Sequence, residues 1–62
     1  MTPKQIKNAQ KMASVEAALD KAPSGPKKDL ALKHYQAAEK AHTAENDADT
    51  NKELDAAPRA LA

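Results

Sequence analysis

Apolar residues recur every three or four positions in the first third of the chain, which is the period of an α-helix. The clearest stripe consists of Met12, Val15, Leu19 and Ala22. A second, narrower stripe is formed by Ile6, Ala9, Ala13 and Ala17. Two stripes on one helix predict that it contacts neighbours on two sides.

The ends of this first helix are marked in the sequence. Thr2 is a good N-cap, Pro3 suits the first helical position, and Gln5 completes a capping box. Pro23 cannot donate a backbone hydrogen bond and disfavours helical backbone at the residue before it. The sequence therefore predicts a helix over residues 3–22.

A second helix is predicted over residues 26–45. Ser24 or Gly25 can cap it, with Pro26 at its first position. The connection is so short that the two helices must run antiparallel. Small residues dominate one face of this second helix, and we expect them to form a close seam against the first helix. That face consists of Leu30, Ala37, Ala41 and Ala44.

A third helix is predicted over residues 50–57, or to 61. Thr50 and Glu53 make another capping-box pattern, and Leu54 begins an apolar face. Pro58 interrupts the pattern, so the helix should end or kink there. The fold class is therefore all-α: an antiparallel helical hairpin plus a short third helix, lying across one end of the hairpin. Residues 1–62 are expected to form one small domain.

The composition limits what this domain can bury. Fifteen of the 62 residues are alanine, Tyr35 is the only aromatic residue, and there is no cysteine. Disulfides and thiolate zinc sites are thus excluded. So thin a core leaves a protein partner or a second copy of the chain as the expected source of further burial.

Membrane insertion and export are not expected from this sequence. No apolar run approaches the roughly twenty residues that span a bilayer, and the lysine-bearing N-terminus lacks an apolar signal core. The sequence predicts a cytoplasmic protein with no membrane contact.

Charge is unevenly distributed. Residues 1–40 carry eight lysines and four acidic residues, whereas residues 41–62 carry two basic and five acidic residues. Lys4, Lys7 and Lys11 recur at helical spacing and could follow a phosphate backbone. The single arginine, the absence of an aromatic stacking platform and the acidic third segment argue against nucleic acid as the partner.

Two patterns raise the alternative of a metal-binding protein. Asp47, Asp49 and Asn51 have the opening spacing of a calcium loop, but Lys52 replaces the turn glycine and Pro58 replaces the last carboxylate ligand. His34 and His42 lie eight residues apart on one predicted helix, too far apart to share a metal without other ligands. We expect no metal and no cofactor from the sequence.

Catalysis also lacks a pattern. Ser14 and Ser24 have no base near them in sequence, and the single glycine, Gly25, excludes a phosphate-cradling loop. The chain is short for a ligand pocket. We expect a protein that is not an enzyme and has no catalytic residues.

Residues 30–61 resemble one tetratricopeptide helix pair, with Asn46-Asp47 at the turn. The matching positions are His34, Ala37, Ala38, Ala41, Leu54, Ala57 and Leu61. Such repeats need several copies to bury a core, and the chain shows no second copy. In size and plan the chain also resembles small bacterial helical-hairpin regulators that form dimers. These resemblances imply a helical hairpin and transfer no functional residue.

The best functional interpretation is a non-enzymatic interaction or regulatory module. Leu32, Tyr35, Glu39 and His42 fall on a flank of the second helix that should point away from the first, and we expect this flank to bind a protein partner or a second copy. Tyr35 would be its anchor, because a lone aromatic ring offers the largest contact area. The alternatives are a metal-binding protein that uses the histidines and the acidic turn, or a weak nucleic-acid binder.

Overall fold

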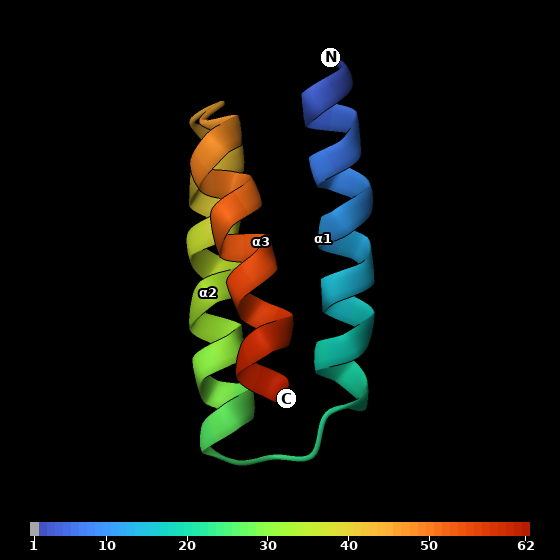
Figure 1. Cartoon of the computed structure of the whole chain (residues 1–62), viewed down its shortest axis with the longest axis vertical. Coiled ribbons are helices and arrows are strands. Elements are labelled where there is room, and N and C mark those ends of the chain that lie inside the picture. Colours follow the sequence, from blue (N-terminus) through green and yellow to red (C-terminus); the bar gives the residue numbers. More distant parts are fainter. Residues whose placement is uncertain (1) are drawn as a thin grey trace.

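The computed structural model describes residues 2–62, which form three helices and, within that range, no strand. They are α1 (Pro3–Lys21), α2 (Pro26–Thr43) and α3 (Asp47–Leu61). Each helix runs antiparallel to the one before it, and the bundle is 35 Å long (Figure 1). The expected all-α fold with a helical hairpin and a third helix is confirmed. Within residues 2–62, no helix is both long and apolar enough to cross a membrane.

The first helix begins as its sequence predicts. The backbone N–H of Gln5 donates to Thr2 Oγ1 at 3.2 Å, and the Thr2 N–H donates to Gln5 Oε1 at 3.0 Å. Pro3 occupies the first turn, where its missing N–H costs nothing. At the other end, Ala22 is already extended, with φ −72° and ψ 141°, because the proline that follows disfavours helical backbone.

The third helix differs most from its prediction. It starts at Asp47 instead of Thr50, because Asn46 is the N-cap: Asn46 Oδ1 accepts from the Asp49 N–H at 3.2 Å, and Asn46 Nδ2 donates to Asp49 Oδ2 at 2.8 Å. Thr50 is fully buried inside the helix, where its hydroxyl donates to the Asn46 carbonyl at 2.8 Å. Pro58 lies within the helix, which continues to Leu61. Since Pro58 is in the last turn, its ring removes only the bond to the Leu54 carbonyl.

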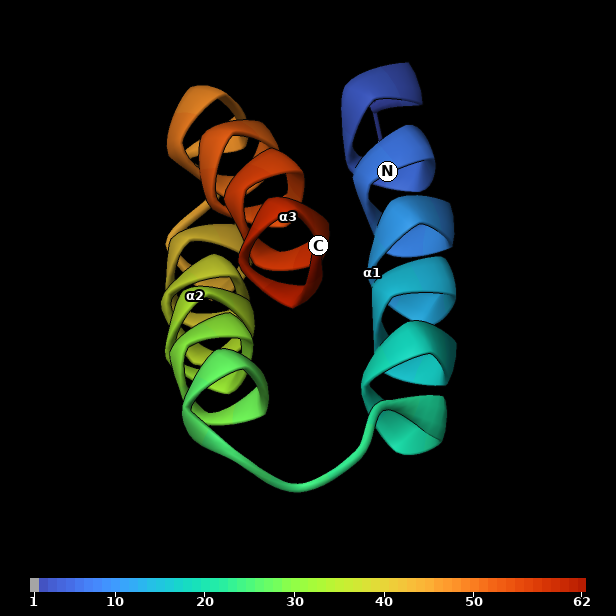
Figure 2. The same cartoon turned by 60° about the horizontal axis from the view of Figure 1, so that its bottom comes forward.

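The position of α3 corrects two further expectations. It does not lie across one end of the hairpin but runs alongside most of α2, with α1 set apart from that pair (Figures 1 and 2). The predicted seam of small residues on α2 is only partly used: Leu30 and Ala44 are exposed, whereas Ala37 and Ala41 lie beside α3. Both alanines border a shallow hollow together with Asp49 and Glu53 of α3.

The core is one cluster shared by all three helices. Its buried apolar members are Val15, Leu19, Ala31, Ala38, Leu54 and Ala57. Met12, Tyr35, Ala60 and Leu61 pack against this cluster and are half-buried. The second predicted stripe of α1 is mostly open to water, since Ile6, Ala13 and Ala17 are exposed and only Ala9 is half-buried. The helix uses one stripe only, and Asn8 extends it at the N-terminal end.

A left-handed residue joins α2 to α3. Glu45 has φ 60°, its N–H donates to the His42 carbonyl at 3.0 Å, and the Asn46 N–H donates to the Ala41 carbonyl at 2.8 Å. This pair of bonds is the Schellman motif, whose left-handed position is normally glycine because a Cβ is disfavoured there. The turn therefore holds a residue that its backbone does not favour.

We expect Glu45→Gly to raise the free energy of unfolding by about 0.5–1 kcal/mol, because glycine adopts positive φ without a steric cost. The measurement is urea denaturation followed by circular dichroism at 222 nm. Glu45→Ala is the matched control: it removes the same carboxylate but keeps the Cβ, and should not stabilise. Equal stabilisation by both variants would show that the charge, not the backbone, matters.

Candidate functional site

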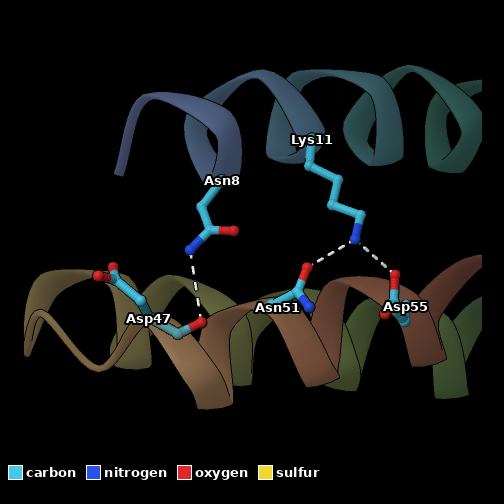
Figure 3. Close-up of polar contacts among 5 residues, drawn as sticks. All are labelled: Asn8, Lys11, Asp47, Asn51 and Asp55. Carbon is cyan, nitrogen blue, oxygen red and sulfur yellow. Dashed lines mark hydrogen bonds and ion pairs between the residues drawn. The ribbon is translucent and has the colours of Figure 1, made fainter. Parts of the chain in front are cut away.

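Two sets of polar contacts surround the core, one between α1 and α3 and one on the α1–α2 side. The first set brings Asn8 and Lys11 of α1 onto α3 (Figure 3). The second set centres on Tyr35 of α2 and the carboxylates around it. The two sets differ in character, since the first joins opposite charges and the second gathers like charges.

Asn8 is a buried polar residue at a core position of α1. Only 6% of it is exposed, and its Nδ2 donates to the backbone carbonyl of Asp47 at 3.4 Å. The carbonyl belongs to the first turn of α3, so the bond fixes the N-terminal half of α1 against the start of that helix. The apolar pattern misses Asn8, although its spacing of four and seven from Met12 and Val15 places it on the same stripe.

Lys11 lies one turn further along α1 and makes two contacts with α3. Its Nζ donates to Asn51 Oδ1 at 2.6 Å and pairs with Asp55 Oδ1 at 2.6 Å. The two α3 residues are four apart, so they face α1 together (Figure 3). The hydrogen bond from Lys11 holds the pKa of Asp55 below its ordinary value of 3.8. One of the three lysines in the predicted phosphate-binding row is thus paired with α3 in this structure.

The second set of contacts lies where Tyr35 meets α1. The Tyr35 hydroxyl donates to Glu16 Oε2 at 3.3 Å, and its ring packs against the core. Burial raises the pKa of Tyr35 above its ordinary 10.0, and the carboxylates of Glu16, Glu39 and Asp20 raise it further. Glu16 is thus bonded to the Tyr35 hydroxyl, and the charges of acidic groups from two helices act on that hydroxyl.

The predicted flank of Leu32, Tyr35, Glu39 and His42 is therefore divided. Leu32 and Glu39, seven residues apart, share an exposed face of α2, and 41% of Leu32 is in contact with water. Tyr35 and His42, also seven apart, are half-buried on the adjoining face. The expectation that Tyr35 points away from the first helix is wrong, because Tyr35 is bonded to α1.

The metal-ligand candidates are separated by the fold. His34 pairs with Glu53 of α3, with Nδ1 3.2 Å from Oε2, while the Nδ1 of His42 is buried without a hydrogen-bond partner. Asp47, Asp49 and Asn51 lie in the first turns of α3, so this segment is a helix and not a loop that could wrap around a cation. Within residues 2–62 no group of three histidine or acidic side chains is placed to hold a metal ion.

Comparison of the chain with family models, with curated proteins and with solved structures finds no match. Function must therefore be inferred from the side chains themselves.

Tyr35 should make stability depend on pH in the alkaline range. Since its pKa is raised in the folded state, its contribution is complete below pH 10 and is lost as the pH rises through the folded-state pKa. We expect the free energy of unfolding to fall more between about pH 9.5 and 11.5 for the wild type than for Tyr35→Phe, because this range begins near the ordinary tyrosine pKa of ~10. Because Tyr35 is the only aromatic residue, absorbance at alkaline pH reports its ionisation directly. The absorbance midpoint should move down in Glu16→Gln, and an unchanged midpoint would contradict this account.

Asn8→Asp should lower the free energy of unfolding by about 1–3 kcal/mol, because an ionised carboxylate cannot donate to the Asp47 carbonyl and would be buried there. The matched control is Gln10→Glu, which makes the same amide-to-acid change at an exposed position of α1. Thermal unfolding followed by circular dichroism compares the two. Similar losses in both variants would show that Asn8 has no special role.

Proposed function

We propose that the protein is a non-enzymatic helical interaction or regulatory module that acts through protein–protein contact. The observation that carries this proposal is an exposed leucine beside a tyrosine that is bonded to one carboxylate and whose pKa is raised by that carboxylate and two others. Leu32 and Tyr35 belong to α2, and the carboxylates are those of Glu16, Asp20 and Glu39. We call these five residues, together with His42, the acidic flank.

The apolar part of the acidic flank supports contact with a protein. The chain has few large apolar side chains, yet Ile6, Leu30 and Leu32 stay 41–50% exposed. Covering the exposed part of one leucine contributes about 1 kcal/mol to a complex. Ile6 belongs to α1. Of the two leucines of α2, only Leu32 lies on the same side as Tyr35, because Leu30 is almost half a turn away from Leu32 around the helix.

The charged part of the flank indicates the chemistry of the partner. Glu16 and Asp20 come from α1 and Glu39 from α2, and all three carboxylates act on Tyr35, which lies three residues from Leu32 along α2. A segment with apolar residues flanked by lysine or arginine meets both requirements, and its cation can also contact the face of the Tyr35 ring. We propose that the acidic flank binds a basic, apolar protein segment.

The test is photo-crosslinking in cells that express the protein, with a photo-reactive phenylalanine derivative in place of Leu32 or, as the matched control, Leu30. Both positions are exposed leucines, 50% for Leu30 and 41% for Leu32, on opposite sides of one helix. We expect a defined protein adduct from position 32 and not from position 30. Adding Glu39→Lys should reduce the yield at position 32 at least about fivefold, because the new cation repels a basic partner.

Two results would refute the proposal: the same adducts from both positions, or an adduct at position 32 that does not respond to Glu39→Lys. A variant that loses helicity by circular dichroism is excluded from the comparison. Leu32 and Glu39 are exposed, so substitution there is expected to leave the fold intact.

A further inference from the structure

The first helix is attached to the rest of the protein by a small contact. Its buried apolar residues are Val15 and Leu19, with Met12 partly buried beside them. The other direct contacts of α1, apart from Asn8, join side chains that water reaches, as at Lys11 and Asp55. Figure 2 shows α1 standing apart from the closely packed α2 and α3. Because apolar stabilisation follows buried area, release of α1 requires less free energy than separation of the other two helices.

The α2–α3 pair has contacts of its own that do not involve α1. The turn between them is closed by the bonds of Glu45 and Asn46, and Thr50 donates to the Asn46 carbonyl. Further along, His34 pairs with Glu53 at 3.2 Å. None of these contacts involves α1, so none of them is broken directly by its release.

The connection between α1 and α2 is suited to opening. Ala22 and Gly25 have extended backbone, and Gly25, with φ +157°, adopts a conformation that L side chains rarely take. A Cβ added at Gly25 meets no atom within 4 Å, so no other part of the chain is packed against the connection at this residue. Four extended residues reach about 13 Å, which is enough to direct α1 toward another molecule.

The α3 side of the groove complements α1 in charge. Residues of α1 include four lysines with Glu16 and Asp20, whereas α3 carries four acidic residues with Lys52 and Arg59. Lys11 of α1 contacts both Asn51 and Asp55 of α3, across the α1–α3 boundary. The helix whose fit to the groove is established is α1 itself, and a second copy of the chain supplies the same helix.

We propose that α1 is an exchangeable helix, and that the α2–α3 groove accepts the α1 of a second copy to form a dimer. In this dimer Lys11 of each copy pairs with Asp55 of the other, and Val15 and Leu19 complete the partner's core. Exchange of an identical element is a low-cost route to a dimer because it creates no new contact. Exchange of α1 needs only the contacts that this helix makes with α2 and α3, so this proposal does not depend on the binding of a partner at the acidic flank.

A charge exchange between two variants tests the proposal directly. Lys11→Glu and Asp55→Lys each place like charges across the α1–α3 boundary within one chain. When the two variants are mixed, both clashes are relieved only if each α1 packs on the other chain. We expect the mixture to form heterodimers, with a dimer fraction at least about fivefold above that of either variant alone. Native mass spectrometry with one variant isotopically labelled separates heterodimers from homodimers.

The double variant Lys11→Glu/Asp55→Lys is the control, because it restores an opposite-charge pair inside one chain. It should behave like the wild type at every concentration. A mixture whose dimer fraction equals the average of its two components overturns the proposal.

A second measurement changes the length of the connection between α1 and α2, residues 22–25, and leaves the groove unchanged. Deletion of Pro23 and Ser24 shortens the connection so that α1 cannot fold back on its own chain, and this variant should be dimeric in sedimentation equilibrium with full helicity. Insertion of Gly-Ser-Gly-Ser after Ser24 should keep the chain monomeric. A shortened variant that is monomeric, whether folded or unfolded, also overturns the proposal.

Discussion

The close approach of α2 and α3 is the constraint on which the rest of the structure depends. A chain with one aromatic residue and fifteen alanines cannot fill a wide core. It instead brings two helices together along small residues, and Ala31, Ala38 and Ala57 are fully buried around Leu54. Small side chains allow helix axes to approach at the short end of the usual range, which gives dense packing with little apolar volume.

The position and attachment of α1 follow from this pairing. Because α2 and α3 use most of the buried small residues on each other, α1 contributes Val15, Leu19 and Met12 and otherwise makes polar contacts. Asn8 and Lys11 set its register against α3, since each has a defined partner there. Polar contacts specify an arrangement more than they stabilise it. The protein thus combines a tightly packed pair with a third helix that is accurately placed and weakly held.

The acidic flank and the exchangeable helix are connected through α1. Glu16 and Asp20 belong to that helix, whereas Leu32, Tyr35 and Glu39 belong to α2. In the closed chain, one molecule supplies both halves of the flank. In an exchanged dimer each flank is rebuilt from two chains, so the same surface is presented twice. A partner that binds the flank would then distinguish released α1 from seated α1, because only the seated helix supplies both carboxylates.

Local rules determined the elements of this protein, and tertiary packing decided how they meet. In the sequence, Thr2 marked the start of α1, and Pro23 and Pro26 marked the two ends of the first connection, because caps and prolines act through their own backbone. The start of α3 could not be read in this way, since Asn46 and Thr50 are both good caps and only the burial of Thr50 favours the earlier start. The helix that packs on an alanine-rich face likewise cannot be predicted from the sequence, because small side chains fit any helix that can approach. Only the tertiary structure placed Ala37 and Ala41 of that face beside α3 and directed the Tyr35 hydroxyl to Glu16. It also buried Asn8, whose side chain binds the Asp47 carbonyl of α3.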